Sequence, residues 1–142
     1  LSLDADIQER FNRKLKNKYD IIEETEVKYS EYMTEDAEYV FVAFGCSSRI
    51  CEAVVDELRA DGVKAGLLRP ITLYPFPKDE IARLGRQVKS MMSVELNLGQ
   101  MVDDVRLAVN GSCPVYFYGR QGGNIYTPEE IVAEFRKANG LA

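Results

Sequence analysis

Apolar residues gather in short continuous runs from residue 39 onward, and each run has the length of a typical strand. Continuous apolarity, rather than alternation, is typical of strands that are covered on both faces, as in a parallel sheet. Each run is followed by a segment whose apolar residues have helical spacing. The runs predict four strands, which are Tyr39 to Phe44, Val63 to Leu68, Met91 to Leu96, and Val115 to Tyr118.

Helices are predicted after each of these strands. The clearest start is at Thr127, because a threonine cap, a proline in the first turn and a glutamate three residues after the cap form a capping box. An alternation of strands and helices describes a parallel sheet with helices on both faces, so the pattern predicts a three-layer α/β fold. The expected helices follow Gly45, begin near Pro77, run from Gly99 to Val109, and start at Thr127.

The amino-terminal part of the chain has a different pattern. Asp4 to Tyr19 reads as a highly charged helix with one narrow apolar stripe, which suits a helix that lies across a domain. Glu24 to Met33 is polar with partial alternation, and this predicts an exposed or edge strand. We therefore divide the chain into an N-terminal charged helix and linker, residues 1–24, and a second unit, residues 25–142. The predicted stripe consists of Leu3, Ile7, Phe11 and Leu15.

Composition excludes several classes of function. The 142 residues carry a formal charge of −5 and give a sequence pI near 4.9, whereas nucleic-acid-binding domains are usually basic. The chain contains no histidine, which removes Ser-His-Asp and Cys-His catalysis and histidine-coordinated zinc. No apolar run approaches the roughly 20 residues that span a bilayer. We therefore expect a cytoplasmic protein with no nucleic-acid partner and no membrane partner.

The three cysteines, Cys46, Cys51 and Cys113, have spacings that fit neither a disulfide framework nor a four-thiolate cluster. Reduced thiols are the expected state in a cytosolic protein. The chain begins at Leu1, with neither an initiator methionine nor the features of a secretory signal. We expect it to be an excised part of a longer protein.

The segment Gly45 to Ser48 follows the first predicted strand and opens a helix. Free backbone N–H groups at such a place can bind a phosphate or stabilise a thiolate, although the phosphate-binding glycine patterns are missing. Serines that cap the helix account for the same residues. Cys46 has no histidine to activate it, so we interpret it as an inert small side chain.

Polar side chains follow the ends of the later strands. The carboxyl ends of parallel strands meet at one edge of a sheet, where ligands of open α/β sheets usually bind. Arg120 could pair there with a phosphate or a carboxylate, or Gly119 to Gly123 could form a mobile turn whose glycines supply positive φ. For Glu95, Asn97 and Gln100, a hydrogen-bond network satisfied within the chain is the alternative to contact with a neighbour. No residues are assigned to catalysis, cofactor binding or metal binding. The candidates for contact with a neighbour are Arg69, Glu95, Asn97, Gln100, Gly119 and Arg120.

Several motifs together resemble the α subunit of 2-oxoacid:ferredoxin oxidoreductases. The resemblance covers nearly the whole chain from about Tyr19 onward, and the motifs occur in the order that this family shows. It departs from many relatives at Cys46, where they carry serine or threonine, and this favours a space-filling role for that residue. The motifs are VAFGCSSR (42–49), GLLRPITLYPFP (66–77), VELNLGQMVDDVR (94–106), YGRQGG (118–123) and TPEEI (127–131).

Within that family, residues 25–142 resemble the carboxyl-terminal domain of the α subunit, which is similar to the transketolase carboxyl-terminal domain. The resemblance implies a three-layer α/β/α sandwich with a mostly parallel five-stranded sheet and one antiparallel strand, for which Val27 to Met33 is the expected source. It also implies oxidative decarboxylation of a 2-oxoacid to acyl-CoA with reduction of ferredoxin. The substrate would be 2-oxoisovalerate or 2-oxoglutarate, and the sequence does not decide between them.

The resemblance also implies how the work is divided in the complex. Thiamine diphosphate, Mg and iron–sulfur clusters would be held by other parts, and no cofactor is expected in this chain. The expected partners are the remainder of the α subunit, the β subunit and other subunits, with ferredoxin and CoA met through the holoenzyme. The chain would be a noncatalytic interface domain, inactive in isolation.

Two alternatives stay open. One is the corresponding domain of a transketolase or of a 2-oxoacid dehydrogenase β subunit, which shares the fold. The other is a stand-alone regulatory module that binds a small anion at the strand ends.

Overall fold

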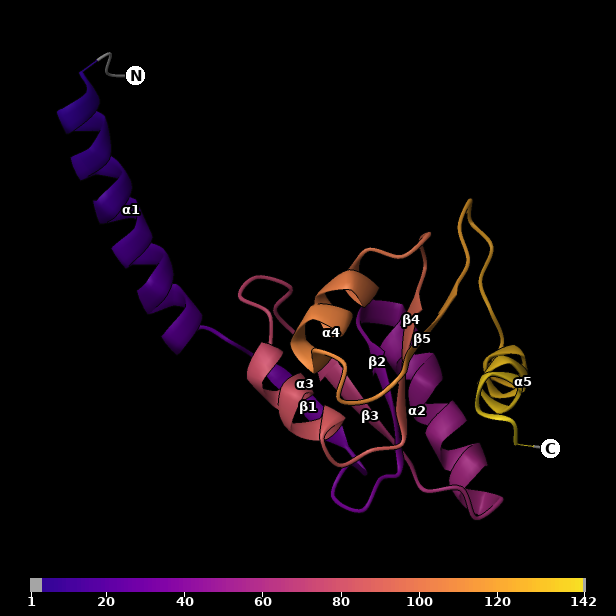
Figure 1. The fold of residues 1–142 in the computed structure, drawn as a ribbon. Coiled ribbons are helices and arrows are strands. Elements are labelled where there is room, and N and C mark those ends of the chain that lie inside the picture. The colour runs from indigo at the N-terminus through magenta and orange to yellow at the C-terminus, as the bar shows by residue number, and fades with distance from the viewer. Residues whose placement is uncertain (1–3, 142) are drawn as a thin grey trace.

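The computed structural model describes residues 4–141 of the chain and contains one five-stranded sheet with helices on both faces (Figure 1). The strands are β1 (Tyr29–Tyr32), β2 (Tyr39–Ala43), β3 (Ala65–Pro70), β4 (Ser90–Glu95) and β5 (Val115–Gly119). The helices are α1 (Ala5–Thr25), α2 (Gly45–Ala60), α3 (Lys78–Gly85), α4 (Met101–Val109) and α5 (Pro128–Asn139).

The sheet has the order β1-β3-β2-β4-β5, and only β1 runs antiparallel, beside β3. The other neighbouring strands pair in parallel. The predicted three-layer fold, the five strands and the single antiparallel strand near Val27 to Met33 are therefore confirmed. The antiparallel direction brings the start of β1 to the end of β3, where Tyr29 is opposite Pro70.

Two apolar clusters hold the layers together. On one face of the sheet, α2 and α5 bury Val54, Leu58 and Phe135 against the strands. On the other face, α3 and α4 bury Leu84 and Val105. The central strand β2 is buried at every position, because its residues pack alternately into the two clusters.

The last helix begins as its sequence predicts. The Thr127 hydroxyl accepts a hydrogen bond from the backbone N–H of Glu130, and the Glu130 carboxylate accepts one from the N–H of Thr127. This reciprocal pair is the capping box, with Pro128 in the first turn.

The amino-terminal helix α1 extends away from the rest of the molecule (Figure 1). Its 21 residues include none that are buried, so it does not lie across the sheet or the other helices. It continues to Thr25, beyond the predicted end at Tyr19, because no glycine or proline interrupts the segment. Leu3, which belongs to the predicted stripe, lies outside the described residues. The boundary between residues 24 and 25 stays a prediction.

Candidate functional site

A cavity of about 220 Å³ lies at the carboxyl end of the sheet, between the segments that follow β2, β3 and β4. Here β2 leads into α2 on one face of the sheet, and β4 leads into α4 on the other. Such a divergence of neighbouring connections leaves a crevice in open α/β sheets. The cavity is lined by Phe44, Leu73, Phe76, Glu95, Asn97, Gln100, Met101 and Asp104.

Glu95 ends β4 and is fully buried beside this cavity. Its carboxylate accepts hydrogen bonds from the backbone N–H groups of Gln100, Met101 and Val102, at 3.1, 2.9 and 2.9 Å. The Ser93 hydroxyl donates a fourth bond at 3.0 Å. The carboxylate therefore satisfies the free N–H groups at the start of α4, and its negative charge is stabilised by the positive end of that helix.

The pKa of the Glu95 carboxyl is lowered from its ordinary value. Burial is the largest single effect and by itself raises this pKa, but the hydrogen bonds from the Met101 and Gln100 N–H groups and from the Asn97 and Ser93 side chains together outweigh it. Glu95 is therefore ionised at neutral pH, and its acceptor positions are occupied by donors from the same chain. This arrangement suits a fixed structural anion, whereas a general acid or base must exchange a proton with a ligand.

Asn97 and two glycines shape the loop after Glu95. The Asn97 side-chain oxygen accepts a hydrogen bond from the Gly99 N–H at 2.7 Å, and Gly99 has a φ of +102°, which favours glycine. A Cβ atom on Gly119 would lie 2.5 Å from the Asn97 carbonyl oxygen. Gly119 therefore lets the loop after β4 approach the end of β5, and the backbone N–H of Arg120 donates to the Glu95 carbonyl at 3.2 Å.

The two arginine candidates do not line the cavity. The Arg120 guanidinium donates to the Ile125 carbonyl at 3.3 Å and lies 3.4 Å from the Glu130 carboxylate, so it braces the loop that leads to α5. Arg69 leaves β3 on the same face as Leu67, which packs with α2. Its Nε is buried and has no hydrogen-bond partner among residues 4–141.

Large apolar side chains, which the polar pattern of the sequence did not predict, are exposed in the loops at this same end. They come from the connections after β3, β4 and β5. Leu98 is the most exposed of them, with 79% of its surface accessible. A usable signal was available in the sequence, because these apolar residues lie in proline-rich or glycine-bounded loops, outside the regular apolar spacing of the predicted strands and helices. The exposed side chains are Ile71, Leu73, Tyr74, Leu96, Leu98 and Ile125.

The start of α2 differs from the interpretation that Ser47 and Ser48 cap the helix. The helix begins at Gly45, so both serines lie inside its first turn, and no side chain caps it. The Ser47 hydroxyl accepts a hydrogen bond from the Tyr126 hydroxyl, and the Ser48 hydroxyl donates to the Gly45 carbonyl. The space-filling interpretation of Cys46 is also wrong, because this side chain is exposed.

The cysteines do not fit an iron–sulfur cluster. Cys51 is buried with α2 and α5, and Cys113 is buried in the cluster on the opposite face of the sheet. Burial raises the pKa of both thiols, which disfavours the thiolate that a metal requires. No group of three or more His, Cys, Asp or Glu residues within 4–141 could hold a metal ion. The cavity itself is smaller than the roughly 300–1,000 Å³ of sites that enclose a cofactor-sized ligand.

Within residues 4–141, no helix is both long enough and apolar enough to span a membrane.

Comparison with known proteins identifies relatives of the chain. It is 47% identical over 138 residues to ketoisovalerate oxidoreductase subunit VorB of Methanothermobacter marburgensis. This match covers 97% of this chain and 39% of that subunit. It is 37% identical over 109 residues to 2-oxoglutarate synthase subunit KorA of Methanothermobacter thermautotrophicus, covering 77% of this chain and 29% of that subunit. The chain thus spans well under half of the length of these curated relatives.

Solved structures show the same fold at lower identity. The 2-oxoglutarate:ferredoxin oxidoreductase from Magnetococcus marinus, solved with 2-oxoglutarate, coenzyme A and succinyl-CoA bound, superposes with a TM-score of 0.77 at 20% identity. That match covers 96% of this chain and 24% of the other. A split-gene transketolase, solved as an inactive tetramer of beta subunits, gives a TM-score of 0.67 at 18% identity. That match covers 80% of this chain and 42% of the other.

The family model that describes the pyruvate:ferredoxin oxidoreductase core domain II matches residues 37–131. This match begins just before β2 and ends inside α5, so it includes the four parallel strands and the cavity between them. The chain therefore belongs to the family of pyruvate:ferredoxin oxidoreductase core domain II.

Proposed function

We propose that this chain is a noncatalytic interface domain of a 2-oxoacid:ferredoxin oxidoreductase. The complex would decarboxylate a 2-oxoacid oxidatively, form acyl-CoA and reduce ferredoxin. Thiamine diphosphate, Mg and the iron–sulfur clusters would be held by the remainder of the subunit and by other subunits. Relatives named as subunits of ketoisovalerate and 2-oxoglutarate enzymes support this assignment.

The observation that carries the interface role is the set of exposed apolar side chains at the carboxyl end of the sheet. Leu96 and Leu98 flank Asn97, whose loop is held in place by Gly99 and by the close approach of Gly119. A rigid loop loses little conformational entropy when it is covered, so it is suited to docking. Exposed apolar surface bordered by polar residues is typical of sites that bind another protein.

The test is the assembly of the full complex when Leu98 is replaced by aspartate. A charge placed in an apolar interface must be desolvated, and we expect Leu98→Asp to weaken association with the other subunits by at least about tenfold. Leu107→Asp is the matched control, because Leu107 is also 79% exposed but lies on the outer side of α4. Co-purification of the subunits and 2-oxoacid-dependent ferredoxin reduction are the two measurements.

Equal assembly and equal activity of the two variants would contradict the interface role. The melting temperature of both isolated chains should stay close to that of the wild type, because neither leucine is buried. The purified chain without its partners should not reduce ferredoxin with 2-oxoisovalerate or 2-oxoglutarate. Turnover by that chain alone would contradict the noncatalytic assignment.

Calorimetry distinguishes the interface domain from the alternative of a stand-alone module that binds a small anion. Thiamine diphosphate, coenzyme A and common nucleotides would be titrated into the isolated chain. We expect no tight binding at the start of α4, because the carboxylate of Glu95 already accepts hydrogen bonds from the N–H groups of Gln100, Met101 and Val102. Tight binding of a nucleotide would favour the regulatory module over the interface domain.

A further inference from the structure

Helix α1 carries a row of apolar residues that starts beside the domain and runs outward along the helix. Its members lie four residues apart, so they follow one another on successive turns. From the inner end outward they are Tyr19, Leu15, Phe11 and Ile7. Tyr19 packs edge-on against Tyr74 of the proline-rich loop, residues 71–77, with ring centres 6.1 Å apart. Phe11 and Ile7 are 57% and 46% exposed, so the row is covered at its inner end and open at its outer end.

The opposite side of α1 is polar, and its charges are paired within the helix. Arg13 pairs with Glu9 and Lys16 pairs with Asp20, each four residues away. At 3.6 residues per turn, all four lie on the side of the helix opposite Phe11. Such pairs are typical of a helix side that faces water, whereas an apolar row is typical of a side that packs on protein. The pattern of α1 therefore favours burial along one side only.

The chain directly after α1 is attached to the proline-rich loop by hydrogen bonds. The Lys28 N–H donates to the Thr72 hydroxyl at 3.0 Å. The Lys28 carbonyl accepts hydrogen bonds from the N–H groups of Ile71 and Thr72 at 2.9 and 3.0 Å. Lys28 follows shortly after the end of α1 at Thr25, so these bonds fix the base of the helix to the loop.

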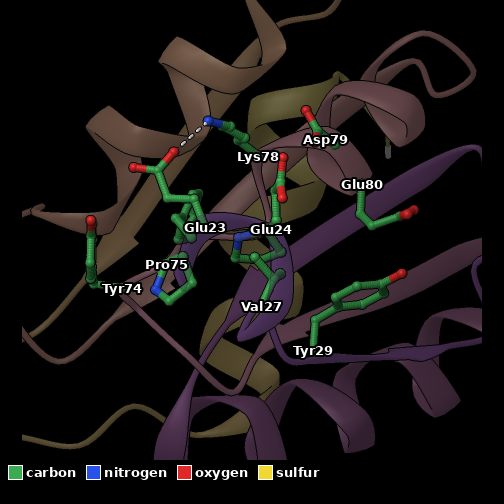
Figure 2. A pocket seen from close by; sticks show the side chains of 11 residues that line it. Glu23, Glu24, Val27, Tyr29, Tyr74, Pro75, Lys78, Asp79 and Glu80 are labelled. Atoms are coloured by element: carbon green, nitrogen blue, oxygen red, sulfur yellow. Dashed lines mark hydrogen bonds and ion pairs between the residues drawn. The ribbon is translucent and has the colours of Figure 1, made fainter. Parts of the chain in front are cut away.

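The last turns of α1 are attached to the same loop and to the start of α3. Glu23 pairs with Lys78 at 3.2 Å, as the dashed line in Figure 2 shows, and Tyr19 contacts Tyr74. These contacts lie before the end of the helix and those of Lys28 lie after it, so together they set the direction of α1. The helix is about 30 Å long at 1.5 Å per residue, and it extends away from its own sheet (Figure 1). The outer part of the row therefore lies away from the two apolar clusters of its own domain.

The helix belongs to the part of the chain that longer relatives share. The alignment with VorB runs over 138 of the 142 residues, and the match with the Magnetococcus marinus oxidoreductase covers 96% of this chain, so both include most of α1. This chain spans only 39% and 24% of those two proteins. In each of them, the segment aligned with α1 is accompanied by far more polypeptide than the 142 residues contain.

We propose that the outer row of α1, formed by Ile7, Phe11 and Leu15, packs against the part of the longer subunit that lies outside this chain. The inference rests on the proposed function, in which the chain is one domain of such a subunit. A segment of the same polypeptide is present at an effective concentration on the order of millimolar, so a short apolar row is sufficient to hold it. A second copy of the chain would have to be held by the same row without this advantage. Because the row is continuous with the contact between Tyr19 and Tyr74, the covering segment would lie beside the proline-rich loop.

Hydrogen exchange of the α1 amides tests the proposal. Mass spectrometry would compare the full-length subunit with the 142-residue chain. We expect α1 to exchange at least about tenfold more slowly in the full-length subunit, because packing of the outer row makes local unfolding of the helix rarer. Peptides from β2 are the internal reference, since this strand is already buried at every position within the chain, and they should exchange equally in both proteins.

Two substitutions in the full-length subunit make the test specific to the outer row. Phe11→Ala should remove most of the extra protection of α1. Arg13→Ala is the matched control, because it truncates another long exposed side chain on the opposite side of the helix, and it should leave the protection within about twofold of the wild type. Alanine is the best helix former, so neither substitution lowers the intrinsic helix propensity. A loss of protection in Phe11→Ala alone would therefore report a loss of packing.

Equal exchange of α1 in the subunit and in the 142-residue chain would overturn the proposal, and so would equal effects of Phe11→Ala and Arg13→Ala. Protection that arises only after the other subunits are added would overturn it by assigning the row to one of them. Protection of the 142-residue chain that rises with its concentration would overturn it in favour of a second copy. These measurements need neither assembly nor ferredoxin reduction, through which Leu98 tests the proposed function, so the failure of one proposal is distinguishable from the failure of the other.

Discussion

The two ends of the sheet differ in what they present to solvent. At the amino end, the connections before β3, β4 and β5 are short and polar, and the turns use Gly62, Asn110 and Gly111 with positive φ. At the carboxyl end, the connections after β3, β4 and β5 are longer and expose six large apolar side chains, whereas Met33 is the one such side chain in the described amino-end connections.

This difference is the basis for the proposal that the carboxyl end is the contact surface of the domain. Polar turns with left-handed residues are sufficient to reverse the chain and need no further explanation. The carboxyl end combines a buried ionised Glu95, a close approach at Gly119 and exposed leucines in one short stretch. The hydrogen-bonding positions of the Glu95 carboxylate are occupied within the chain, whereas the exposed apolar groups are left for a partner to cover.

Removal of Glu95 should cause the largest loss of stability at the carboxyl end. Glu95→Ala leaves the buried N–H groups of Met101 and Val102 and the partly buried N–H of Gln100 without acceptors, and we expect the free energy of unfolding to fall by about 3 kcal/mol. Urea unfolding measures this value. Asp104→Asn is the control, since Asp104 lies in the first turn of α4 but is exposed, and it should change stability by less than about 0.5 kcal/mol.

The contribution of Glu95 should also depend on pH. Its folded pKa is lowered, so the stabilisation is complete above the unfolded pKa of about 4.3 and is lost as the pH falls through the folded value. The stability difference between the wild type and Glu95→Gln should therefore shrink as the solution is acidified. A difference that does not change with pH would mean that the carboxylate is not the stabilising species.

A methyl group on Gly119 should have the next largest effect. Gly119→Ala would place Cβ 2.5 Å from the Asn97 carbonyl oxygen and 2.4 Å from the Phe117 ring, so the loop after β4 must move. We expect a loss of about 2 kcal/mol in unfolding free energy. Gly85→Ala is the comparison, because its Cβ would lie 3.3 Å from a Val109 methyl group. Equal effects of the two changes would mean that the loop yields easily.

The smallest effect on stability is expected for Arg120→Ala. The Arg120 side chain is 40% exposed and its guanidinium lies 3.4 Å from the Glu130 carboxylate, and such pairs contribute less than about 1 kcal/mol. The melting temperature of the isolated chain should hardly change, whereas activity or subunit assembly should fall in the full complex. Arg106→Ala, which removes an exposed arginine paired with Asp103, should affect neither. A large melting shift would make Arg120 a residue of the fold.

Much of the fold could be predicted because the responsible patterns are local. The buried run at β2, the capping box at Thr127 and the helical spacing in α2 each depend on residues close in sequence. The predicted end of α1 and the predicted caps at the start of α2 were less accurate. The Ser47 hydroxyl bonds Tyr126, which is far along the chain, and spacing around Ser47 contains no information about that partner.

The sequence by itself determined the order of elements, the parallel character of four strands and the family motifs, since each is encoded in short-range apolar spacing or in contiguous residues. Tertiary structure alone decided that Glu95 binds the start of α4 and that Arg120 donates to the Ile125 carbonyl instead of lining the cavity. These outcomes depend on distances between segments separated by loops, and the geometry of such contacts is fixed only when the sheet has formed.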